Sequence, residues 1–184
     1  MNREFKDAIE NSPIIAAIKN DAELHQCLTC DSRVIFILYG DICNIADIVD
    51  TVKSAGKIAL VHLDLIGGLN AKEIAVDFIK KYTRADGIIS TRPQLIKHAK
   101  ELSLYTVMRF FVIDSMAYDN IEKQLHAVRP DFIEILPALM PKVISRICDL
   151  STIASSNPCS RRNSDLWNPF GSFWWMVCSI TLGP

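Results

Sequence analysis

Apolar runs alternate with helical patterns along the chain from residue 14 to about residue 150. The apolar runs recur about every 18 to 30 residues, and each is followed by a segment with helical periodicity. This order is typical of parallel strands joined by helices. The pattern therefore predicts an α/β, TIM-barrel-like (β/α) fold with six recognisable βα units. The predicted strands are Ile14–Ile18, Val34–Tyr39, Ile58–Asp64, Gly87–Thr91, Tyr105–Ile113 and Phe132–Leu136.

Flanking segments add detail to this pattern. Residues 1–12 form an amphipathic pattern with Phe5 and Ala8 on one side, which predicts a short helix that plugs the amino-terminal face of the barrel. Asn70-Ala71-Lys72-Glu73 has a capping-box pattern that predicts the start of the third helix.

The pattern changes after about residue 150. A closed barrel of this kind needs eight units, and residues 151–184 do not continue the rhythm: all three tryptophans fall in the last 18 residues. The sequence therefore predicts an incomplete barrel domain over residues 1–150, with the seventh and eighth units missing or altered, followed by a divergent tail over residues 151–184. The tail is interpreted either as an aberrant or truncated C-terminus or as a diverged lid or interface, disordered or covering a sheet edge.

Composition narrows the function classes. With 184 residues and 49% hydrophobic residues, the chain is long and apolar enough for one good core. The formal net charge of −1 provides no broad basic field. The first ten residues lack the apolar core of a signal peptide, and no apolar run is long enough for a membrane span, so we expect a cytoplasmic protein.

The six cysteines include one CxxC pair, Cys27 and Cys30. Zinc would require a second pair or histidines at ligand spacing, and the four histidines are scattered, so the pair is interpreted as reduced packing cysteines and no metal site is predicted.

Charged residues fall at the ends of the predicted strands. His62 and Asp64 are two residues apart and so share one face of the third strand, while Arg109 and Glu134 interrupt the fifth and sixth. Ligand sites of βα barrels lie at the carboxyl ends of the strands. With Lys19 and Arg92, which follow the first and fourth strands, these residues predict a site for an anion that carries hydroxyl groups. Two alternatives to a ligand site stay open. His62, Arg109 and Glu134 could form a buried salt-bridge network that fixes strand register. Lys19 and Arg92 could be solvated charges on loops.

Gly67 and Gly68 lie in the loop after the third strand. Exposed backbone amides there could bind an anion at a helix start. The alternative is a tight turn that needs a positive φ.

Five segments carry a family resemblance: Val61–Leu69, Asp86–Pro93, Arg109–Ser115, Pro130–Pro137 and Pro141–Ile144. Over about residues 5–150, the chain resembles the family of glycerol uptake operon antiterminator regulatory proteins. The resemblance implies a TIM-barrel-like bacterial regulator, not an enzyme, that has glycerol 3-phosphate as its effector and no other cofactor. It implies that such a protein binds the leader mRNA of glycerol operons and lets transcription pass a terminator.

The RNA-binding half of this function rests on the resemblance, because lysine and arginine form only small clusters such as Lys80-Lys81 with Arg84. Two other functions stay open from the residues: a TIM-barrel enzyme acting on a small phosphorylated sugar, with His62, Asp64 and Glu134 as acid and base, and an inactive fragment. Unpaired edges at the first and sixth strands would favour a homo-oligomer.

Overall fold

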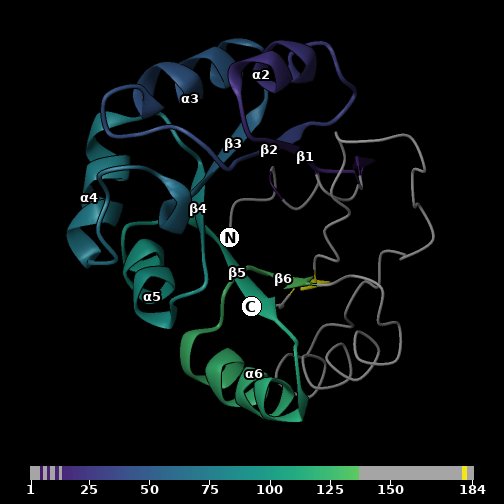
Figure 1. Cartoon of the computed structure of the whole chain (residues 1–184), viewed down its shortest axis with the longest axis vertical. Helices are drawn as coiled ribbons and strands as arrows, with labels where there is room; N and C mark the ends of the chain where they lie inside the picture. The colour runs from purple at the N-terminus through teal and green to yellow at the C-terminus, as the bar shows by residue number, and fades with distance from the viewer. Residues whose placement is uncertain (1–4, 6–7, 9–10, 13, 137–179, 182–184) are drawn as a thin grey trace.

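The computed structural model describes residues 5, 8, 11–12, 14–136 and 180–181. Within these residues, six parallel strands lie side by side in the order of the sequence and form a curled half-barrel (Figure 1). All six predicted strands are confirmed, and so is the TIM-barrel-like fold class. The strands are β1 (Ala16–Ile18), β2 (Val34–Ile37), β3 (Ile58–His62), β4 (Gly87–Ser90), β5 (Tyr105–Phe111) and β6 (Phe132–Leu136).

A helix follows each of the first five strands and lies on the convex side of the sheet (Figure 1). A short 3₁₀ turn, η1 (Leu63–Leu65), intervenes between β3 and its helix. Each helix buries one apolar side against the sheet, as Ile45, Val49 and Val52 do in the second of them. The helices are α2 (Asp21–Cys27), α3 (Ile45–Ser54), α4 (Glu73–Tyr82), α5 (Pro93–Glu101) and α6 (Ser115–Val128).

A two-residue strand from the C-terminal segment, β7 (Ile180–Thr181), pairs with β6 in the antiparallel direction. Ile180 is opposite Ile133, and Thr181 is opposite Phe132. The edge of β6 is therefore paired at these two positions, where the sequence predicts an open edge. The rest of the predicted tail, and the missing or altered seventh and eighth units, lie outside the described residues.

The strands are buried on both faces, as their continuous apolar sequences predict. On β2, Ile35 and Ile37 pack against the helices, while Val34 and Phe36 belong to an inner cluster on the concave face. Phe5, in helical backbone, closes this inner cluster. Its ring centroid lies 4.4 Å from that of Tyr105 and 4.7 Å from that of Phe132. Since Tyr105 and Phe132 begin β5 and β6, Phe5 covers the amino-terminal side of the inner cluster, as predicted. Most of the predicted helix over residues 1–12 lies outside the described residues.

Polar side chains join neighbouring strands at this amino-terminal edge of the sheet. Asp86, just before β4, accepts hydrogen bonds from the Ala59 backbone N–H on β3 and from Lys53 Nζ, each at 2.8 Å. Asp131, just before β6, accepts from both the backbone N–H (2.9 Å) and the hydroxyl (2.7 Å) of Thr106 on β5. The same device therefore fixes the start of two strand pairs.

Lys57 makes a third connection at this edge. Its buried ammonium group donates to the carbonyl oxygens of Cys30 (2.7 Å) and Ser32 (2.8 Å), which precede β2. A buried ammonium group is tolerated because these carbonyls replace its water.

Five of the six observed strands are shorter than predicted: β1 begins two residues later, and β2, β3, β4 and β5 end one or two residues earlier. Two of the boundary differences concern the loop after β3 and the helix that follows it. β3 ends at His62, and Asp64 lies in η1 instead of in the strand. α4 begins at Glu73, with Lys72 at its N-cap and no side-chain capping bond, so the predicted capping box from Asn70 does not form. No helix in the described part of the chain is long and apolar enough to span a membrane.

Candidate functional site

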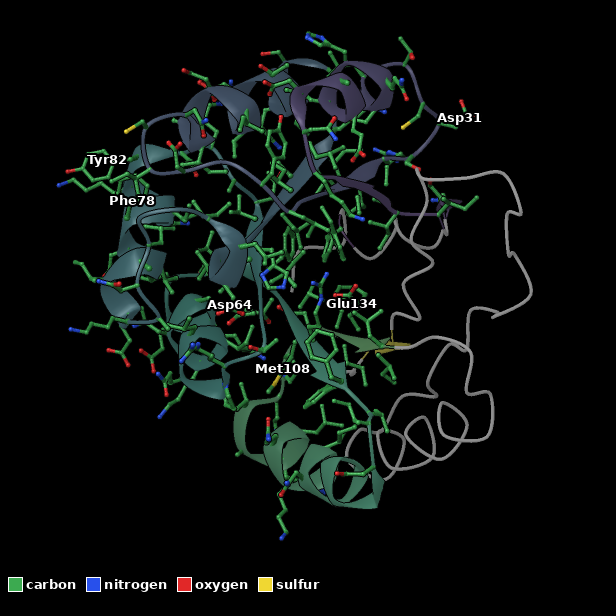
Figure 2. The ribbon with its side chains drawn as sticks, in the orientation of Figure 1. Asp31, Asp64, Phe78, Tyr82, Met108 and Glu134 are labelled. Carbon is green, nitrogen blue, oxygen red and sulfur yellow. The ribbon has the colours of Figure 1, made fainter. Side chains whose placement is uncertain are left out.

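Three of the predicted site residues lie on the concave face, on the carboxyl-terminal side of the inner apolar cluster. His62, Arg109 and Glu134 each follow an inner-cluster residue of the same strand by two positions, so all three point to the concave side. Figure 2 shows Glu134 on this side of the sheet. These three side chains therefore occupy the position that ligand sites take in βα barrels. The inner-cluster residues beneath the three are Leu60, Val107 and Phe132.

Arg109 and Glu134 form a bidentate ion pair across β5 and β6. Nε of Arg109 lies 2.5 Å from Oε2 of Glu134, and Nη2 lies 3.1 Å from Oε1. The two residues are directly opposite each other in the strand register. Burial raises the pKa of Glu134, and the hydrogen bonds and charge of Arg109 oppose this rise. The contacts therefore support the interpretation that Arg109 and Glu134 fix the register of β5 against β6.

His62 is buried without a hydrogen-bond partner among the described residues. Its side chain is 2% exposed, and neither ring nitrogen bonds to any group in this part of the chain. Burial, together with the nearby charge of Arg109, lowers the pKa of His62 to about 4, while the charge of Asp64 opposes this shift. The imidazole is therefore neutral near pH 7. A buried polar group left without partners destabilises a fold by about 1–3 kcal/mol.

Asp64 connects the loop after β3 to the end of β4. Its Oδ2 accepts from the Ser90 hydroxyl (3.0 Å), the Thr91 backbone N–H (2.8 Å) and the Thr91 hydroxyl (3.2 Å). Arg92 Nε lies 3.4 Å from Oδ1, and Nδ1 of His62 lies 3.9 Å from Oδ2. Asp64 thus brings His62 and Arg92 together. Sequence reasoning did not select Ser90 and Thr91 for the site, although two consecutive hydroxyl residues at a strand end were a usable signal.

Arg92 and Lys19 lie at the outer part of this edge. Arg92 is the N-cap residue of α5, and about half of its side chain is exposed. Lys19 follows β1, two strands away from β3, and is exposed; its backbone N–H donates to Glu23 Oε2 at 2.7 Å. Close polar contacts therefore join the predicted ligand residues in two sets, Arg109 with Glu134 and Asp64 with His62 and Arg92, and Lys19 lies at the same edge of the sheet.

The glycine loop after β3 makes specific backbone contacts. The Gly67 N–H donates to the Gly40 carbonyl at 2.9 Å, and the Gly67 carbonyl accepts from the Ile42 N–H at 3.0 Å. Gly68 has a φ of +82°, which is the positive φ that the tight-turn interpretation requires. Since the Gly67 N–H is already bonded and α4 begins only at Glu73, Gly67 does not offer its amide to an anion; a role for Gly68 stays a prediction.

The CxxC pair lies on the opposite side of the sheet from His62, Arg109 and Glu134. Cys27 ends α2 and is buried in the cluster between sheet and helices, and burial, followed by the charge of Cys30, raises its pKa to about 11. Cys27 is therefore a protonated packing residue, as predicted. Within the described residues, no group of three His, Cys, Asp or Glu side chains gathers to hold a metal ion.

Known proteins with similar folds include two solved antiterminator structures. A glycerol uptake operon antiterminator regulatory protein from Listeria monocytogenes str. 4b F2365 superposes with a TM-score of 0.72 at 32% identity, over 74% of each chain. A glycerol uptake operon antiterminator-related protein from Thermotoga maritima MSB8 gives 0.65 at 35% identity, over 73% of this chain and 76% of its own. The 3-dehydroquinate dehydratase of Aquifex aeolicus VF5, at 9% identity and a TM-score of 0.52, shares the fold alone.

Sequence comparison agrees with the structural likeness. The uncharacterized protein YgcP from Escherichia coli (strain K12) is 41% identical over 141 residues, which are 77% of this chain and 74% of YgcP. The pattern of the family described as glycerol-3-phosphate responsive antiterminator matches residues 14–155. That range contains all six parallel strands and all six predicted ligand residues. The chain therefore belongs to the glycerol-3-phosphate responsive antiterminator family.

Proposed function

We propose that this protein is a transcription antiterminator that responds to glycerol 3-phosphate. It binds the effector at the carboxyl-terminal edge of the half-barrel and binds the leader mRNA of glycerol operons, so that transcription passes a terminator. The family description and the name of the Listeria protein support this proposal. Since the leader is bound as it is transcribed, the protein acts in the cytoplasm, as a monomer or as a homo-oligomer.

The observation that carries the proposal is the buried polar group on the concave face. A dry core would be more stable with apolar residues at His62, Arg109 and Glu134, because burying polar groups costs free energy. The group lies where the barrel fold places its ligand sites, in a chain whose family is described by its response to a small phosphorylated triol.

Each of the six predicted ligand residues has a role in this proposal. His62 and Asp64 contact the effector, Arg92 and Lys19 offset the charge of its phosphate, and the Arg109–Glu134 pair forms the wall of the site. Arg92 suits this task because its guanidinium is half-exposed and can reach an outer phosphate while it stays near Asp64. Gly68 lies in the loop after β3, four residues beyond Asp64.

Transcription of a glycerol operon leader in vitro tests the function. Purified RNA polymerase is run on a template with the leader and its terminator, with and without the protein and millimolar glycerol 3-phosphate. We expect more read-through transcript only when protein and glycerol 3-phosphate are both present. Inorganic phosphate is the ligand control, and a template with an unrelated terminator is the RNA control. Read-through that is equal at both terminators, or unchanged by glycerol 3-phosphate, would contradict the proposal.

A further inference from the structure

His62 differs from the other polar residues around it. Among the described side chains, its ring nitrogens are the buried polar atoms without a hydrogen-bond partner. A neutral imidazole has one N–H donor and one nitrogen acceptor. Both groups are removed from water and unpaired. The N–H of the ring therefore lacks an acceptor, and the other ring nitrogen lacks a donor.

The charges near His62 are already balanced. Arg109 is paired through two hydrogen bonds with Glu134, and Asp64 is paired with Arg92 and with hydroxyl and amide donors. A phosphate dianion placed against the ring would lie beside the Asp64 carboxylate, where the described residues show Arg109 and Arg92 already paired with carboxylates. A hydroxyl group adds no charge, so the surroundings of the ring favour a neutral partner.

The distance between His62 and Asp64 fits such a partner. Nδ1 of His62 and Oδ2 of Asp64 are 3.9 Å apart, which is too far for a direct hydrogen bond. One oxygen between them can bond to both atoms, as bridging water does across gaps of this size. A hydroxyl group can donate to the carboxylate while it accepts from the ring, or donate to the ring nitrogen.

Building on the proposed function, we propose that His62 and Asp64 bind the glycerol hydroxyls of the effector, with its phosphate directed outward to the exposed guanidinium of Arg92. His62 is then the residue that makes the site select a vicinal diol over a plain alkyl phosphate. Since solvent does not reach the ring nitrogens, the groups that cover them must move when the ligand enters.

Calorimetric titration with two ligands tests this orientation. Glycerol 3-phosphate and n-propyl phosphate have the same phosphate, but only the first has hydroxyl groups. We expect the wild-type protein to prefer glycerol 3-phosphate by about tenfold or more, because a site built for hydroxyl groups rejects an analogue that lacks them. His62→Phe is expected to lose the preference and to bind both ligands with the affinity of n-propyl phosphate. His98→Phe, at a histidine on α5 that bonds to Asp77, is the matched control and keeps the preference.

Nitrogen NMR of the wild-type His62 ring gives a second readout that does not depend on a variant. The ring signals are expected to move with glycerol 3-phosphate and to stay in place with n-propyl phosphate. If the wild type binds glycerol 3-phosphate while His62→Phe keeps the preference, or if the ring signals do not move, this orientation is wrong and the proposed function stands. If the wild type does not bind glycerol 3-phosphate, the proposed function falls and the orientation falls with it.

Discussion

The two edges of the curved sheet use buried and partly buried polar side chains in different ways. At the amino-terminal edge, Lys57, Asp86 and Asp131 each bond to backbone groups of a neighbouring strand or of the loop before it. At the carboxyl-terminal edge, Arg109 and Glu134 also pair, but His62, on the same face of the sheet, makes no hydrogen bond within the described part of the chain. The first edge is complete without a ligand, whereas the second is not.

This difference separates stability from function within one sheet. A side chain whose bonds are all made inside the fold contributes to the free energy of folding whether or not a ligand is present. A buried side chain with unmade bonds lowers that free energy until a ligand supplies them. We therefore expect substitutions at the amino-terminal edge to lower stability without changing ligand binding, and substitutions at His62 to change ligand binding without lowering stability at neutral pH.

The largest effect is expected for the ion pair. Glu134→Leu leaves the Arg109 charge buried without a partner, so the free energy of unfolding should fall by about 3–5 kcal/mol. The double variant Arg109→Leu with Glu134→Leu should recover most of this loss, because it removes both charges. Urea unfolding of the three proteins measures both values. A double variant as unstable as the single one would show that the pair is not an independent unit.

The next effect is the pH dependence that His62 contributes. Its pKa is about 4 in the folded protein and near 6.5 in the unfolded chain. The unfolded chain therefore takes up the proton first, and stability falls as the pH falls from about 6.5 to 4. The wild type should lose about 3 kcal/mol over this range relative to His62→Phe. Urea unfolding of both proteins at a series of pH values isolates the contribution, and parallel curves would contradict a buried neutral ring.

A smaller effect is expected at the amino-terminal edge. Asp131→Ala removes the acceptor for the amide and hydroxyl of Thr106, so the free energy of unfolding should fall by about 2 kcal/mol. Asp31→Ala, at an exposed aspartate, is the control and should stay within about 0.5 kcal/mol of the wild type. Glycerol 3-phosphate affinity should stay the same in both variants. A selective loss of affinity in Asp131→Ala would break the separation between the two edges.

The smallest effect is expected for His62 itself without ligand. His62→Phe at pH 7 removes two unpaired polar atoms and keeps an aromatic ring, so its stability should stay within about 1 kcal/mol of the wild type or rise. Thermal and urea unfolding in ligand-free buffer measure this. A loss of several kcal/mol would mean that the ring makes stabilising bonds after all.

The sequence predicted the strands well because each is a continuous apolar run bounded by polar residues. It also predicted that His62, Arg109 and Glu134 belong to one network, since an unpaired charge inside a buried strand destabilises the fold. It did not predict which charges pair, because the pairing of Arg109 with Glu134 depends on the register of β5 against β6.

Local boundaries were the weaker part. Asp64 leaves the strand because its carboxylate bonds to Ser90 and Thr91 across the sheet edge, a contact between residues 26 and 27 positions apart. Asp86 and Asp131 were not predicted as strand anchors, because a carboxylate before a strand looks like an ordinary loop residue until its partner strand is placed. Residues that act through long-range contacts are the ones that a local pattern cannot identify.

Thermal unfolding of the wild-type protein with glycerol 3-phosphate tests the central claim most directly. A ligand that binds only the folded protein at about 100 times its dissociation constant stabilises it by about 2.7 kcal/mol, and each kcal/mol raises the midpoint by about 2–4 °C in a chain of this size. We expect a cooperative transition whose midpoint rises with glycerol 3-phosphate and not with inorganic phosphate. A midpoint that does not move with millimolar glycerol 3-phosphate, or that rises equally with inorganic phosphate, would contradict an effector site at the carboxyl-terminal edge.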